Sequence, residues 1–126
     1  MHPVAEAPAR LLLVDDEPEI AESLSDFLVR KERYDVSLAA TGEEAIAVME
    51  RMLADENELD LVLLDMRMPG ISGLDVLGWI REHPVLQHTR VVLVTAASGS
   101  EEKVEALSAG ADDYITKPFS MEELLA

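Results

Sequence analysis

Three short apolar runs place the strongest constraint on how this chain folds. They are LLLV at residues 11–14, LVLL at 61–64 and VVLV at 91–94. Each run is apolar at every position, whereas a strand with one solvated face alternates apolar and polar residues. The runs therefore predict strands that are buried on both faces, as in a parallel sheet covered by helices on either side.

Weaker signals complete an alternation of strands and helices. The apolar runs belong to expected strands at 10–14, 60–65 and 90–95, and shorter patterns predict further strands at 34–40 and 112–116. Helical spacing and capping residues predict the helices, at 17–30, 42–53, 73–82, 98–110 and from 120 onward. Five strands alternating with five helices indicate a single α/β domain with a parallel sheet.

Composition excludes several classes of protein. The chain has 126 residues, no cysteine and a net charge of −16, so disulfides are excluded and the surface repels nucleic acid and anionic lipid. No apolar run approaches the roughly 18 residues of a membrane-spanning helix. Residues 1–9 are expected to be a loose leader ahead of a domain at 10–126, whose last helix is short enough to suggest truncation. A cytoplasmic location is expected.

Polar residues follow four of the expected strands. Asp15 and Asp16 end the first strand, Asp65 ends the third, Thr95 the fourth, and Lys117 follows the fifth. Ligands of open parallel sheets bind outside the carboxyl ends of the strands, so these side chains are expected to meet at one edge. The acidic pair alone also suits the start of a helix, but the joint occurrence at four strand ends favours a functional site.

Crowded carboxylates repel one another, so a cation must compensate them. Lys117 is one candidate and a divalent metal is the other. Oxygen-only ligands favour a hard ion, Mg²⁺ or Mn²⁺, which retains several waters and can accept a phosphate oxygen. Asp65 would then act as a nucleophile toward phosphorus, assisted by Lys117 and the Thr95 hydroxyl.

Four motifs closely resemble the receiver domain of two-component response regulators: LLVDDE, LVLLDMRMPGISG, VVLVTA and ADDYITKPF, in this order over about residues 10–125. The resemblance implies a doubly wound, flavodoxin-like fold of the chemotaxis-regulator type with strand order 2-1-3-4-5. It also implies a switch domain that is not itself an enzyme.

The resemblance assigns a role to each site residue. Asp65 is the expected phosphoacceptor, and the metal ligands are expected to be Asp15, Asp16, Asp65 and the Arg67 backbone carbonyl, with Asp16 preferred to Asp15. The remaining matches are the switch hydroxyl Thr95, the small residue Ala96, the switch aromatic Tyr114, the phosphoryl-contacting Lys117, a cis peptide at Pro118, and Arg67 and Ala97 as residues that tune the rate of dephosphorylation.

The implied donor is a histidine on a sensor kinase or a phosphotransfer protein, and the implied receiver of the signal is an output domain or downstream protein. The face of the fourth helix, fifth strand and fifth helix is expected to change on phosphorylation and is a candidate homodimer surface. Two alternatives remain: an unphosphorylated receiver-like scaffold, and a phosphatase of the haloacid dehalogenase type. The latter expects its nucleophile in the first strand, as Asp-x-Asp, where this chain has VDDEPE.

Overall fold

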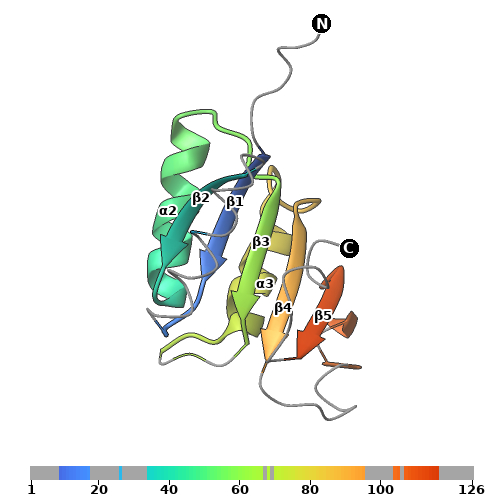
Figure 1. Ribbon diagram of the computed structural model, residues 1–126. Helices are drawn as coiled ribbons and strands as arrows, with labels where there is room; N and C mark the ends of the chain where they lie inside the picture. The colour runs from blue at the N-terminus through green and yellow to red at the C-terminus, as the bar shows by residue number, and fades with distance from the viewer. Residues whose placement is uncertain are drawn as a thin grey trace, which may run out of the picture.

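The computed structural model describes residues 9–17, 26, 34–66, 68, 70–95, 104–105 and 107–116, with only the backbone of Tyr34, Thr95 and Thr116. Its centre is a parallel sheet of five strands (Figure 1). The strands are β1 (Ala9–Val14), β2 (Tyr34–Ala39), β3 (Leu61–Asp65), β4 (Arg90–Thr95) and β5 (Asp113–Thr116). Their order is β2-β1-β3-β4-β5, which confirms the predicted doubly wound arrangement.

The register of the strands brings their carboxyl ends to one edge of the sheet. Val14 of β1 lies opposite Leu64 of β3, and the next residue of β3, Asp65, lies opposite Val94 of β4. Thr95 pairs in turn with Thr116 at the end of β5. The residues that follow β1 and β3 therefore emerge side by side (Figure 1).

Two helices pack on one face of the sheet: α2 (Gly42–Ala54) and α3 (Gly73–Glu82). Their apolar residues join the alternate strand residues that point to this face in one buried cluster, which includes Leu12, Val14, Ala45, Met49, Val62, Leu64, Val76, Leu77, Ile80 and Leu93. The strand residues on the opposite face, such as Leu11, Leu13 and Leu63, are buried as well. Burial on both faces is what the uninterrupted apolar runs predict.

Polar side chains define where both helices begin. The Thr41 hydroxyl accepts a hydrogen bond from the backbone N–H of Glu44 at 3.0 Å, and the Glu44 carboxylate accepts one from the N–H of Ala40. Ser72 and Asp75 form a reciprocal capping box at the start of α3. Such caps satisfy backbone donors that the first turn leaves unpaired, so both helix starts are fixed locally by sequence.

The predicted helices at 17–30, 98–110 and from residue 120 lie wholly or largely outside the described residues. Residues 1–8 of the predicted leader lie outside them as well. None of the helices in the described part of the chain combines the length and apolar character needed to cross a membrane.

Candidate functional site

Asp15 is the first acidic residue at the carboxyl edge, directly after β1. Its backbone N–H donates to the carbonyl of Ala39 at 3.0 Å, which extends the β1–β2 pairing by one step. Its Oδ1 accepts a hydrogen bond from the backbone N–H of Glu17 at 2.8 Å, which forms an Asx turn. The side chain is only 5% exposed. The carboxylate is thus held at the edge by a backbone donor two residues further along the chain.

Asp65 is the last residue of β3, and its side chain is 6% exposed. The next residue, Met66, donates its N–H to the carbonyl of Val94 at 2.9 Å and accepts from the N–H of Gly73 at 3.0 Å. A Cβ built on Gly73 would lie 2.4 Å from the Asp65 carbonyl oxygen. The first turn of α3 therefore abuts the backbone of Asp65, and the absence of a side chain at Gly73 permits that approach.

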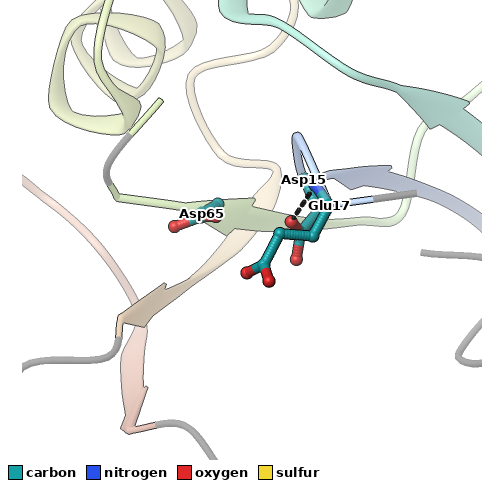
Figure 2. A group of neighbouring side chains, drawn as sticks. All are labelled: Asp15, Glu17 and Asp65. Atoms are coloured by element: carbon teal, nitrogen blue, oxygen red, sulfur yellow. Dashed lines mark hydrogen bonds between the residues drawn. The ribbon is translucent and has the colours of Figure 1, made fainter. Parts of the chain in front are cut away.

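Asp15, Glu17 and Asp65 form one carboxylate group at this edge (Figure 2). One oxygen from each side chain can be chosen so that all lie within 4.8 Å of one another. Two of these carboxylates are buried, so like charges there repel more strongly than they would in water, while the exposed Glu17 adds less. Three oxygen donors of one charge fit a hard divalent cation better than any other ligand.

The structure brings together two of the three predicted acids and adds one that the sequence analysis did not name. Asp16 is exposed and does not belong to the group of three, whereas Glu17 does. Glu17 lies beside Asp15 because its backbone N–H donates to the Asp15 carboxylate in the Asx turn. The predicted preference for Asp16 over Asp15 as a metal ligand stays a prediction.

Tyr114, the predicted switch aromatic, lies on β5 opposite Leu93 of β4. It is partly buried and packs against the cluster beneath α2 and α3. Thr95 ends β4, as predicted, but its side chain lies outside the described residues. The other predicted site residues also lie outside them: Arg67, Ala96, Ala97, Lys117 and Pro118.

Comparison with protein families gives one match that spans nearly the whole chain. Residues 11–126 match the family model described as the response regulator receiver domain. The chain is 43% identical over 119 residues to the probable transcriptional regulatory protein TcrX of Mycobacterium tuberculosis, covering 94% of this chain and 47% of that protein. It is 41% identical over 116 residues to the sensory transduction protein RegX3 of Mycolicibacterium smegmatis, covering 92% and 47%. The chain thus spans about half the length of these relatives.

Solved structures give the same result. A CheY-like response regulator receiver domain protein from Methanospirillum hungatei superposes with a TM-score of 0.80 at 31% identity, covering 94% of this chain and 88% of that one. The response regulator TrrA of Thermotoga maritima, solved in complex with Mg²⁺ and beryllofluoride, gives 0.75 at 38% identity, with 93% of each chain covered.

Proposed function

This chain belongs to the family of response regulator receiver domains, which act as switch domains, and from that premise we propose that Asp65 is its phosphoacceptor. The proposed donor is a phosphohistidine of a sensor kinase or a histidine phosphotransfer protein. The observation that carries the proposal is the burial of the Asp65 carboxylate at the carboxyl edge of the sheet, within 4.8 Å of two further carboxylates. Family membership also decides against the phosphatase alternative.

The proposed ligands of a Mg²⁺ or Mn²⁺ ion are Asp15, Asp16, Asp65 and the backbone carbonyl of Arg67. The oxygen-only donors of the described group fit such an ion, and TrrA, a similar receiver, was solved with Mg²⁺. When bound, the ion neutralises negative charge on the carboxylates and on the phosphoryl oxygens. Glu17 adds a further negative charge to the same place.

The proposed reaction is a displacement at phosphorus. An oxygen of Asp65 forms a bond to phosphorus while the bond from phosphorus to the histidine nitrogen breaks, and that nitrogen keeps the electron pair and takes up a proton. Lys117 and the Thr95 hydroxyl donate hydrogen bonds to the phosphoryl oxygens. The small Ala96 leaves room for the phosphoryl group. The long Arg67 side chain partly covers it and, with Ala97, sets how fast water removes it.

The proposed output is a change of surface. The new charge at Asp65 attracts Thr95, and the half-buried ring of Tyr114 moves into the space released. The face of the fourth helix, β5 and the fifth helix then binds an output domain, a downstream protein or a second copy differently. The domain assists its own phosphorylation and dephosphorylation and catalyses no other reaction.

The curated relatives are about twice as long as this chain, and TcrX is described as a transcriptional regulator. We propose that residues 10–126 act as the cytoplasmic phosphoacceptor part of such a regulator, with residues 1–9 as a loose leader. The net charge of −16 opposes direct contact of this domain with DNA, so DNA binding belongs to an output domain.

The decisive experiment is incubation with acetyl phosphate or phosphoramidate and Mg²⁺, followed by intact-mass measurement. The wild-type chain should gain about 80 Da, the mass of one phosphoryl group, and lose it in base, as acyl phosphates do. Asp65→Asn should gain nothing, because an amide is not a nucleophile toward phosphorus.

Asp35→Asn is the matched control, because Asp35 is an exposed carboxylate on β2, away from the site, and should leave phosphorylation intact. If the wild-type chain stays unmodified with both donors, the scaffold alternative is correct. If Asp65→Asn still gains the same mass, the phosphoacceptor is another residue.

A further inference from the structure

The side chain of Arg81, in the last turn of α3, donates four hydrogen bonds. Its Nε donates to the carbonyl of Gly110 at 2.8 Å, and one terminal nitrogen donates to the carbonyls of Thr89 at 2.6 Å and Gln87 at 3.1 Å. The other terminal nitrogen forms an ion pair with Asp112 at 2.9 Å. A planar guanidinium is the one side chain that can donate in these directions at once.

The acceptors belong to two connections at the amino edge of the sheet, opposite the carboxylate site. Gln87 and Thr89 lie between α3 and β4, whereas Gly110 and Asp112 lie just ahead of β5. Gly110 has a φ of +107°, and a Cβ there would lie 3.3 Å from Cγ and Nε of Arg81. The glycine therefore permits both the turn and the close approach of the arginine.

Asp112 connects this network to the sheet itself. Its backbone N–H donates to the carbonyl of Val91 at 2.9 Å, and its carboxylate accepts from the N–H of Val91 at 2.8 Å. The same carboxylate oxygen accepts from Arg81. The arginine thus holds the residue that fixes where β5 begins along β4. Its side chain is 20% exposed and that of Asp112 is 44% exposed.

β5 has only four residues, Asp113–Thr116, so any displacement at its start reaches its end. Tyr114 pairs with Leu93 and Thr116 with Thr95. Lys117 is the next residue in the chain, one peptide unit or roughly 3.8 Å further on. The two proposed contributions to the switch, from Tyr114 in this strand and from Lys117 after it, therefore depend on how Asp112, the residue just ahead of the strand, is held.

We infer that Arg81 is a positioning residue for β5, which sets the strand's place beside β4 from the edge opposite the phosphorylation site. The inference rests on the proposed function only for its effect on phosphoryl binding, because the effect on the strand itself is independent of it. The proposed metal ligands lie at the ends of β1 and β3 or just beyond them, and neither strand pairs with β5. Loss of Arg81 should therefore weaken the binding of a phosphoryl group and leave the binding of metal nearly unchanged.

The test compares Arg81→Gln and Arg81→Lys with the wild-type chain, using Mg²⁺ alone and then Mg²⁺ with beryllofluoride, a mimic of the phosphoryl group. Both variants should bind beryllofluoride roughly five- to tenfold more weakly, because the lysine that follows β5 loses part of a charge-assisted hydrogen bond. Mg²⁺ affinity, measured by calorimetry, should stay within about twofold of wild type, because its ligands follow β1 and β3. Arg81→Lys should not restore beryllofluoride affinity, because lysine keeps the positive charge but lacks the planar guanidinium that donates in several directions.

Arg51→Gln is the matched control, because Arg51 is also the basic residue in the last turn of its helix, α2, and is exposed. It should change neither affinity. If Arg81→Gln does not fold, Asp112→Asn serves instead: it removes the ion pair, leaves three of the arginine's hydrogen bonds, and should change binding in the same direction.

Amide hydrogen exchange reads out the strand directly. In Arg81→Gln the amides of β5 should exchange faster while those of β1 and β3 do not. Unchanged exchange in β5, equal losses of Mg²⁺ and beryllofluoride affinity, or full rescue by lysine would each overturn the inference. If wild-type protein itself fails to bind beryllofluoride, the proposed function is wrong, and the exchange result still decides the role of Arg81.

Discussion

The two edges of the sheet handle charge in opposite ways. At the amino edge Arg81 forms an ion pair with Asp112, and the carboxylate of Asp60 accepts a hydrogen bond from the backbone N–H of Arg10 at 2.8 Å. At the carboxyl edge, carboxylates of Asp15, Glu17 and Asp65 gather within 4.8 Å. Among the described residues, the amino edge shows one pair of opposite charges, whereas the carboxyl edge brings three carboxylates together. The first arrangement holds loops in place, and the second is suited to binding a divalent cation.

The largest effect is expected from a substitution at the carboxyl edge, where the start of α3 touches the backbone of β3. Gly73→Ala would place a Cβ 2.4 Å from the Asp65 carbonyl oxygen and 2.8 Å from the Cα of Met66. Neither is the end of a flexible side chain, so the start of α3 must move away from β3. We expect the free energy of unfolding to fall by about 2–3 kcal/mol, as measured by urea unfolding.

Gly78→Ala, on the same helix, is the control for this prediction. A Cβ at Gly78 meets nothing within 4 Å, so the substitution should only remove the conformational entropy that glycine costs a helix, stabilising by about 0.5–1 kcal/mol. Similar effects of the two substitutions would show that the contact between α3 and Asp65 is not tight.

The second prediction concerns the like charges themselves. Saturating Mg²⁺ should stabilise the wild-type chain and leave Asp65→Asn much less affected, since a ligand stabilises only the state that binds it. Thermal unfolding with and without Mg²⁺ measures both effects. Equal stabilisation of both chains by Mg²⁺ would contradict the proposed role of Asp65 as a metal ligand.

Much of the sheet could be predicted from the sequence because local patterns determine it. Uninterrupted apolar runs predicted β1, β3 and β4, and capping residues with helical spacing predicted α2 and α3 close to their observed bounds. The strand order came from the resemblance and is confirmed. The proximity of Asp15 and Asp65 followed from the rule that parallel strands end at one edge.

The contacts of Arg81 could not be predicted in the same way. It bonds to three backbone carbonyls, and a carbonyl acceptor leaves no residue-type signal in a sequence. Its charged partner, Asp112, is 31 positions away on another connection. Gly73 was expected only as the start of a helix, because its closer role depends on how closely α3 approaches β3 after folding.

The smallest predicted effect is on Mg²⁺ affinity, and it distinguishes the roles of the two acidic residues Asp16 and Glu17. Asp16 is a proposed metal ligand, whereas Glu17 is an exposed member of the observed carboxylate group. We expect Glu17→Gln to weaken Mg²⁺ binding by only about two- to threefold, because solvent screens an exposed carboxylate that acts through its charge. Asp16→Asn should cost about tenfold or more, as the loss of a direct ligand does.

Calorimetric titration of the two variants with Mg²⁺ measures this ranking, and raising the salt concentration sharpens it. Screening should nearly abolish the effect of Glu17→Gln and leave that of Asp16→Asn largely intact, because direct coordination is screened far less than a charge in water. If Glu17→Gln causes the larger loss at every salt concentration, then Glu17 replaces Asp16 as the ligand. The carboxyl edge would then bind its cation through the three side chains that the structure already brings together.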